Sequence, residues 1–346
     1  MDKKAKQDIV LADCEPEELD ELIAGLNESL GIDIKIFTKI ANAGHTRLYN
    51  IYRYLVYAFF PIKFFFYRKR YRYIICWQQF YALFFCQMCR IFRVKNENYI
   101  VACNYTYKPK RLFTREYFNF FKKNSSCKFM YKIFVPSFNY AKKCADELEI
   151  DENKFAVVPF GLPDTYEQWR KTEVKEKDYC FAIGRSNRDF DFLVEAWKYV
   201  SDHQKLIIAS DTYKPEVDLP DNVIHRTDIV GDSQFPYIAN CKAMIIPIDD
   251  GAICSGDTAL LKAMSYRKPV IVTEPSTLGE MYIENGVNGL LVKKDLKEFA
   301  SAVEELLSNP EKMRNLGINA RKQFEKSYSR YHMGVKLGEK IKSSEK

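Results

Sequence analysis

The sequence predicts an α/β protein of two domains, each built on a parallel sheet with helices on both faces. Its 346 residues are enough for two domains of ordinary size, each with its own core. Short apolar runs alternate with amphipathic stretches of helical length, which is typical of βα units. Two of the predicted strands lead through glycine-containing loops, at Gly184 and Gly256, directly into helices. These three observations together favour a doubly wound fold.

The first part of the chain supplies the strands and helices of the first domain. Pro61 is expected to bend the second helix, or to divide it, and Ser137 is expected to be an N-cap. The expected strands are 9–12, 32–40, 73–76, 99–103 and 132–135, followed by the VVPFG strand at 157–161. The expected helices are 17–30, 46–72, one starting near 77, 115–123 and 139–148.

The polar stretch 162–177 fits a hinge, after which the alternation of strand and helix resumes. The expected strands of the second domain are 179–183, 205–209, 223–226, 244–248 and 269–273. The expected helices are 190–200, 235–241, 259–267, 296–307, 310–317 and 318–324, with a tail to 342. We therefore expect domains at 1–161 and 162–330, and a final segment, 331–346, that returns to the first domain.

The net charge of +7 is unevenly distributed. Residues 46–123 hold 16 Lys and Arg against 2 acids, and 26 of the 51 aromatic residues, whereas residues 1–45 hold ten acids and five bases. A basic, aromatic-rich segment predicts an anionic surface as a partner, either lipid headgroups or nucleic acid. We favour an anionic membrane surface, because no nucleic-acid-binding motif accompanies the basic residues. The same aromatic residues also fit the core of the first domain.

No segment is expected to cross the bilayer. The apolar run 55–66 is too short, and the run 74–92 contains three glutamines and Arg90. The ten cysteines are scattered and no secretory signal opens the chain, so we expect a reduced, cytoplasmic protein, peripheral on the inner face of the plasma membrane. Cys86 and Cys89 form a lone C-x-x-C that is more typical of core packing than of a metal site.

The two glycine-containing loops are candidate anion sites. Free N–H groups and the positive end of a helix dipole favour a phosphate at such a loop, and glycine lets the backbone approach closely. The sequence S255-G256-D257-T258 opens one helix, and G184-R185-S186-N187-R188-D189 opens another. An ordinary βαβ crossover with a polar N-cap explains the loop at 255–258 equally well, but two such loops are stronger evidence than either alone.

The order of motifs from 244 to 292 resembles the nucleotide-sugar half of a GT-B glycosyltransferase of the family-4 type. The resemblance rests on a strand, a small-residue loop, a helix carrying AM-x-x-x-KPVI, and then GE-x-x-x-x-NGVNGLLV, and it extends over about residues 130–335. It implies two Rossmann-like domains with parallel sheets facing a central cleft. The family commonly has two glutamates, eight positions apart, where this chain has Cys254 and Lys262.

The resemblance also implies roles for particular residues. Arg185 and Arg188 would stabilise the leaving diphosphate, and Lys262 would lie near the ribose or the phosphate. Gly184, Ser186, Asp189, Cys254, Ser255, Gly256, Asp257 and Thr258 would bind the donor. Asp257 serves equally well as a cap of its helix. No metal site or cofactor is expected, because the only candidate acidic pair begins a helix where capping explains it.

Acceptor contacts are expected on the first domain, at the ends of its strands. His45 follows the second strand, although most such histidines are surface residues. Trp77, Gln78 and Gln79 could stack on and hydrogen-bond a sugar, or merely cap a helix. Tyr107 and Lys108 lie in a basic aromatic loop that could hold the phosphates of a lipid-linked acceptor, or simply be solvated.

The resemblance thus implies a retaining, metal-independent hexosyltransferase. It would move a sugar from a UDP- or GDP-sugar to a saccharide or lipid-linked acceptor in capsule, exopolysaccharide or other cell-surface polysaccharide assembly. The alternative is a non-catalytic nucleotide-sugar-binding or scaffold protein of the same fold, which the loss of both glutamates would explain.

Overall fold

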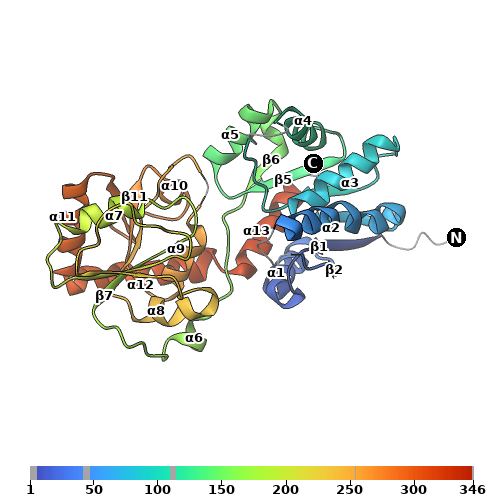
Figure 1. Cartoon of the computed structure of the whole chain (residues 1–346). Helices are drawn as coiled ribbons and strands as arrows, with labels where there is room; N and C mark the ends of the chain where they lie inside the picture. The colour runs from blue at the N-terminus through green and yellow to red at the C-terminus, as the bar shows by residue number, and fades with distance from the viewer. Residues whose placement is uncertain (1–5, 42–46, 110–113, 254, 345–346) are drawn as a thin grey trace. The chain divides into compact units, whose positions relative to one another are not determined.

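A computed structural model describes residues 6–41, 47–109, 114–253 and 255–344. The chain forms two compact units (Figure 1). One comprises Met1–Pro159 together with Arg330–Lys346, and the other comprises Phe160–Ser329. Each unit contains one six-stranded sheet in which all strand pairs are parallel.

The first unit has the strand order β2-β1-β3-β4-β5-β6. Its strands are β1 Gln7–Ala12, β2 Ile34–Thr38, β3 Tyr71–Cys76, β4 Tyr99–Ala102, β5 Met130–Val135 and β6 Phe155–Val157. Its helices are α1 Asp20–Leu30, α2 Arg47–Phe66, α3 Gln79–Ile91, α4 Thr114–Ser125, α5 Phe138–Leu148 and α13 Arg330–Ser343. The strand order reverses between β1 and β3, which places a crevice at the carboxyl ends of these two strands.

Helix α13 packs tightly on α1, although about 300 residues of chain separate them. Glycines make the close approach possible. A Cβ on Gly334 would lie 2.1 Å from the carbonyl oxygen of Leu22, and one on Gly25 would lie 2.2 Å from that of Tyr331. The end of the chain is therefore an integral part of the first unit.

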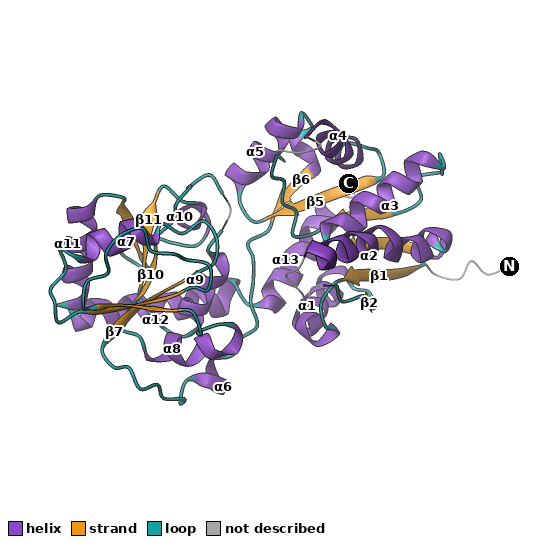
Figure 2. Ribbon diagram, in the orientation of Figure 1, coloured by secondary structure: helices purple, strands orange, loops and turns teal. Residues whose placement is uncertain are grey.

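The second unit has the strand order β12-β11-β10-β7-β8-β9, which reverses between β7 and β10. Its strands are β7 Tyr179–Ile183, β8 Lys205–Ala209, β9 Val223–Arg226, β10 Met244–Ile246, β11 Val270–Glu274 and β12 Leu290–Lys293. Its helices are α6 Tyr166–Trp169, α7 Phe190–Trp197, α8 Gln234–Asn240, α9 Asp257–Ser265, α10 Thr277–Met281, α11 Leu296–Leu307 and α12 Pro310–Ser327. The alternation of strands and helices is visible in Figure 2.

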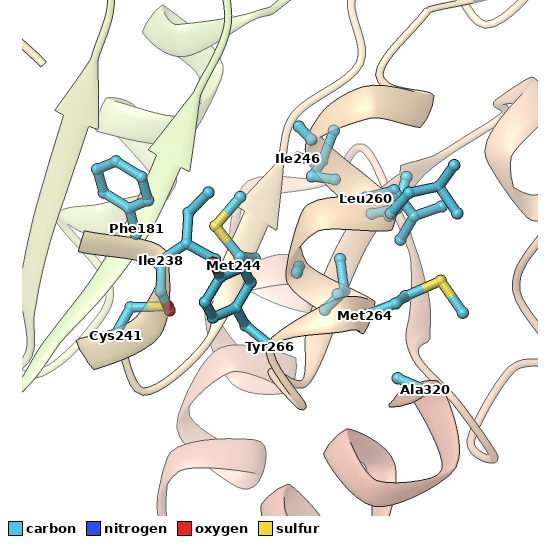
Figure 3. Close-up of a cluster of buried hydrophobic side chains, with 14 of the residues drawn as sticks. Phe181, Ile238, Cys241, Met244, Ile246, Leu260, Met264, Tyr266 and Ala320 are labelled. Carbon is cyan, nitrogen blue, oxygen red and sulfur yellow. The ribbon is translucent and has the colours of Figure 1, made fainter. Parts of the chain in front are cut away.

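Apolar side chains of the second sheet and of the helices on one of its faces form a continuous core (Figure 3). Met244 and Ile246 of β10 lie in this cluster with Leu260 and Met264 of α9, and all four are fully buried. This packing fixes the position of α9, and hence of the loop that precedes it, relative to the sheet.

Several expected boundaries differ from the observed ones. The expected helices 310–317 and 318–324 are a single helix, α12, because Gly317 marks a close contact and not a break: its Cβ would lie 2.1 Å from the carbonyl oxygen of Arg267. Helix α2 continues through Pro61 and ends at Phe66, since residues 68–70 form a 3₁₀ turn and β3 begins at Tyr71. None of the described helices is both long enough and apolar enough to cross a bilayer.

Candidate donor site on the second unit

The two glycine-containing loops follow β7 and β10, the neighbouring strands at which the strand order of the second sheet reverses. Residues 184–189 connect β7 to α7, and residues 247–256 connect β10 to α9. In open parallel sheets, ligands bind outside the carboxyl ends of the strands at such a point. Both loops therefore stand where this fold places its ligand.

The two loops are hydrogen-bonded to each other. Asp189 N–H donates to the carbonyl of Pro247 at 3.0 Å, and the side chain of Asn187 makes three further bonds. Its Oδ1 accepts from Asp250 N–H at 2.8 Å, and its Nδ2 donates to the carbonyl of Asp250 at 3.0 Å and to Ser255 Oγ at 2.7 Å. The loops thus form one connected surface.

Arg188 fills the space between the two glycines. A Cβ on Gly184 would lie 2.8 Å from Cγ and Nε of Arg188, and a Cβ on Gly256 would lie 3.3 Å from its Nη2. Gly256 has φ +96°, a conformation that disfavours other residues. Any side chain at either glycine would displace the arginine, so both positions serve to admit the guanidinium.

The guanidinium of Arg188 is only partly hydrogen-bonded. Its Nη1 donates to the carbonyls of Ser186 and Asn187 at 3.2 and 3.1 Å. Its buried Nε has no hydrogen-bond partner among the residues that the structure describes. Burial lowers the pKa of Arg188 to about 10, against the opposing effect of Asp257, so the side chain remains a cation at neutral pH. A partly buried cation with a buried, unpartnered N–H donor favours an anionic ligand.

Asp257 is the first residue of α9 and lies beside this cation. Burial raises the pKa of its carboxyl group, and the N–H of Thr258 and the charge of Arg188 oppose that shift. Its Oδ1 accepts from Thr258 N–H at 3.0 Å, while the N-cap position itself is taken by Gly256, without a side-chain cap. The side chain of Asp257 therefore accepts from one of the free N–H groups in the first turn of α9 and does not satisfy the whole N-terminus.

Arg185 and Asp189 form ion pairs with residues outside the two loops. Arg185 is exposed and makes a two-pronged ion pair with Asp211, in which its Nε donates at 2.7 Å. Asp189 caps α7 by accepting from Phe192 N–H at 2.9 Å, and it pairs with Lys294 at 2.5 Å. A pocket of about 370 Å³ is lined by residues from segments 185–191 and 210–216.

Lys262 projects toward the start of α8. Its Nζ lies 4.8 Å from the ring centroid of Phe235, and burial lowers the pKa of the amine, against the opposing charge of Asp232. Cys254, the other position that departs from the resembling family, lies outside the described residues. Lys262 is therefore grouped with residues 232–235 and not with Arg188.

On the first unit, Trp77, Gln78 and Gln79 lie at the reversal point of the sheet but are engaged in local contacts. Trp77 is buried, with Arg330 5.2 Å above its ring. Gln78 caps α3 through Phe80 N–H and donates to Asp13 at 3.1 Å and to Tyr57 at 3.2 Å. The capping alternative for Gln78 therefore describes the contacts seen.

Gln79 and Tyr107 are likewise buried, whereas Lys108 is exposed. Gln79 is held by the backbone N–H of Thr106, which donates to its Oε1 at 2.7 Å. Tyr107 stacks on Tyr117 with 6.0 Å between ring centroids. His45 lies outside the described residues. Of the expected acceptor residues that are described, Lys108 alone presents an exposed side chain.

Sequence reasoning missed Asn187 and Lys294, both of which contact the two glycine-containing loops. Lys294 bridges Asp189 to Asp249, which lies 3.8 Å away. Asn187 has φ +54°, and asparagine is one of the few residues that adopt this conformation readily. An asparagine between a glycine and a helix was therefore a usable signal. No pattern in the sequence around Lys294 indicated its ion pairs with Asp189 and Asp249.

Comparisons with known proteins bear on the fold and on the family resemblance. Residues 177–309 match the family model described as "Glycosyl transferases group 1". Two solved structures are similar over nearly the whole length of the chain. Sucrose-phosphate synthase from Thermosynechococcus elongatus has a TM-score of 0.66 and 14% identity over 98% of this chain and 99% of that chain. A glycosyltransferase from Rickettsia africae has a TM-score of 0.67 and 14% identity over 99% of each chain. The chain has the GT-B fold. The expected fold class and the family resemblance are thereby confirmed.

Two further relatives bear on the GT-B assignment. An uncharacterized glycosyltransferase of Methanocaldococcus jannaschii is 32% identical over 167 residues, which are 44% of this chain and 45% of that protein. The match thus spans less than half of the relative's length. HepE from Anabaena, solved in complex with UDP, has a TM-score of 0.66 and 15% identity over 97% of this chain and 100% of that chain. The second unit of this GT-B chain carries the group 1 glycosyl transferase match.

Proposed function

We propose that the chain is a retaining, metal-independent glycosyltransferase whose second unit binds a nucleotide sugar through its diphosphate. The observation that carries the proposal is the partly buried Arg188, held between Gly184 and Gly256 with its buried Nε unpartnered among the described residues. Its position at the strand-order reversal, beside the N-terminus of α9, is where a phosphate gains most from N–H groups and the helix dipole.

UDP is the nucleotide we propose first, because HepE, which shares the fold, was solved with UDP. The diphosphate would contact Arg188 and the N–H groups of residues 255–258. Lys262 would then face the ribose or the base, next to Phe235 and Asp232. Arg185 would reach the diphosphate by exchanging Asp211 for a phosphate oxygen. The exposure of that ion pair favours such an exchange, since surface ion pairs contribute little stability.

In the proposed reaction, the bond between the anomeric carbon and the diphosphate oxygen breaks, and a bond from that carbon to an acceptor oxygen forms on the same face. The proton of the acceptor hydroxyl passes to an oxygen of the leaving diphosphate. Arg188 stabilises the negative charge that builds on the diphosphate as the glycosidic bond breaks. Among the described residues, no group of three or more His, Cys, Asp or Glu side chains could hold a metal ion.

We propose a saccharide, carried on a lipid, as the acceptor, and assembly of cell-surface polysaccharide as the role. The first unit would bind it, with exposed Lys108 available for the lipid phosphates. Trp77 would not stack on the sugar, because its ring is buried beneath Arg330.

A second candidate is a non-catalytic nucleotide-sugar-binding protein. Lysine at position 262 and cysteine at position 254 favour it, because the resembling family commonly has glutamates there. A lysine donates hydrogen bonds to ribose or phosphate, but it accepts none from sugar hydroxyls.

The test is a thermal-shift panel of UDP, GDP and their sugars, followed by a donor hydrolysis assay with the same protein. We expect UDP to raise Tm and a UDP-sugar to be hydrolysed slowly without an acceptor. A Tm shift without any turnover would favour the binding protein. The absence of a shift with every nucleotide would refute the donor site itself.

A further inference from the structure

Helix α2 of the first unit is apolar on two opposite faces. One face packs on the domain and buries Val56, Tyr57, Phe64 and Phe65. The other is exposed and is also made of large apolar side chains. A helix that is apolar all round is normally buried all round, so the exposed face of α2 is unusual for a surface helix.

The exposed side chains form a straight stripe along the helix. At 100° per residue, positions 48, 51, 52, 55, 59 and 66 fall within about 100° of one another around the axis. Leu48 is 79% exposed, Phe59 63% and Phe66 69%. We define the α2 face as these residues together with two exposed side chains at the end of α3: Leu48, Ile51, Tyr52, Leu55, Phe59, Phe66, Ile91 and Phe92.

The end of α3 extends the stripe because it touches the end of α2. The rings of Phe65 and Phe92 lie 5.4 Å apart, and the rings of Phe65 and Phe66 lie 5.7 Å apart. Ile91 and Phe92 therefore add their exposed surface where the stripe ends. The exposed apolar side chains of the two helices thus lie near each other and not as single scattered residues.

Helix α2 and the turn that follows it carry basic side chains and no acidic ones. Helix α2 contains Arg53 and Lys63 and no acid, and Arg68, Lys69 and Arg70 follow it directly. Arg68 and Arg70 lie over the rings of Phe65 and Tyr67, at 4.7 and 4.8 Å from the ring centroids. Lys63, Arg68, Lys69 and Arg70 are thus gathered at one end of the apolar stripe, and basic side chains beside an apolar face are typical of interfacial helices that bind anionic lipid.

We propose that the α2 face is the membrane-docking surface of this protein, with its apolar side chains in the headgroup and acyl boundary of an anionic leaflet and with Lys69 and Arg70 among the headgroups. The proposal names the partner surface for the transferase reaction proposed above, whose acceptor is lipid-linked, but binding to lipid does not depend on catalysis. In this proposal α2 lies on the surface of the bilayer and does not cross it.

Charge favours lipid over a second copy of the chain as the occupant. Pairing of two α2 faces would bring basic segments together without any acid from either helix to offset them. An anionic leaflet offers negatively charged headgroups to the basic side chains and an apolar acyl layer to the exposed apolar ones. Each Lys or Arg near such a leaflet strengthens binding about fivefold.

The test is co-sedimentation with vesicles of phosphatidylcholine alone and of phosphatidylcholine mixed with phosphatidylglycerol, without donor or acceptor. We expect binding to the mixed vesicles only. Leu55→Ser with Phe59→Ser should weaken binding at least about tenfold, since both apolar side chains are lost from the membrane. Phe138→Ser, at an equally exposed aromatic on α5, should leave binding unchanged.

The contribution of the basic side chains to vesicle binding is tested with a separate pair of double variants. Lys69→Gln with Arg70→Gln should weaken binding to the mixed vesicles about 25-fold. Lys297→Gln with Lys326→Gln removes the same charge from the second unit and should have little effect. Equal loss in both pairs would mean that net charge alone drives binding, which would overturn the assignment to α2.

Insertion is measured directly with Phe59→Trp and vesicles of brominated lipid. We expect the lipid to quench the fluorescence of the Phe59→Trp variant more strongly than that of Tyr199→Trp, which places the added indole on the second unit. Failure to bind either vesicle, or binding with equal quenching in the two variants, would overturn the proposal. So would a dimer in sedimentation velocity that Leu55→Ser with Phe59→Ser converts to monomer. Loss of vesicle binding with nucleotide binding intact would leave the donor site standing.

Discussion

Nη2 of Arg188 lies 3.3 Å from the point where a Cβ on Gly256 would stand. The loop after β7 thus supplies a cation, and the loop after β10 supplies the space and the helix N-terminus beside it. Neither loop forms the candidate site alone. This relationship leads to the first three predictions.

Gly256→Ala should impair nucleotide binding and lower stability together. The new methyl group would press on Leu278, 2.9 Å away, and on Arg188, and alanine at φ +96° costs about 1 kcal/mol or more. Thermal unfolding and UDP titration measure the two effects. Gly286→Ala is the control, because Gly286 also has positive φ but has no heavy atom within 4 Å of its Cβ position. Equal loss of UDP affinity in both variants would contradict the role of the close approach.

Arg188→Gln should weaken UDP binding by about 10- to 100-fold, the effect of losing one or two charge-assisted hydrogen bonds to phosphate. Arg185→Gln removes the same charge from an exposed residue that is already paired with Asp211, and its effect should be smaller. Isothermal titration with UDP compares the two variants. If Arg185→Gln proved the more damaging, the diphosphate would lie in the pocket beside residues 210–216 and not against Gly256.

Asn187→Ala should loosen the connection between the two loops. It removes three hydrogen bonds, each of about 1 kcal/mol, to Asp250 and Ser255. We expect faster amide hydrogen exchange at residues 249–256 and weaker UDP binding. Asn319→Ala removes a single exposed hydrogen bond to Val287 and serves as the control. Unchanged exchange in this loop would show that Asn187 does not hold it.

Gly334→Ala should destabilise the first unit by several kcal/mol, because backbone atoms of Leu22 and Leu26 occupy the space of the new methyl group. Gly338→Ala should cost less, since the nearest atoms there are Oγ and Cβ of Ser29, at 2.6 and 2.7 Å, and not a backbone carbonyl oxygen at 2.1 Å. Thermal unfolding and limited proteolysis near Ser329 measure the detachment of α13. The opposite order of stability would contradict the observed packing of α13 on α1.

Cys127 should react with iodoacetamide at a pH where ordinary cysteines do not. A hydrogen bond from Cys86 lowers the pKa of Cys127 to about 6, against the opposing effect of burial. A lowered pKa means that the thiolate predominates above about pH 6, so the alkylation rate should rise from pH 5 and level off near pH 7. Burial raises the pKa of Cys103 to about 12, and it should stay unmodified.

Peptide mass spectrometry across this pH range distinguishes the two cysteines. Cys86→Ala should move the midpoint of Cys127 alkylation upward, toward the usual thiol range near about 8.5. A midpoint in that usual range in the unaltered protein would contradict the hydrogen bond between the two thiols.

The sequence by itself determined the order of elements and the two candidate loops. Strand β7 has its expected bounds, and Ser137 caps α5 as expected, its Oγ accepting from Tyr140 N–H at 3.1 Å. These features follow from hydrophobic periodicity and from capping, which act between residues close together in the chain. The glycines at 184 and 256 were readable for the same reason.

Only the tertiary structure decided which side chains meet. It paired Arg185 with Asp211 and Arg188 with the space beside Gly256, although both arginines lie in one loop and read alike in the sequence. It also covered Trp77 with Arg330, a residue of the last helix. The physical reason is that the partner of a side chain depends on strand order and helix packing over long chain separations, and no local pattern records these contacts.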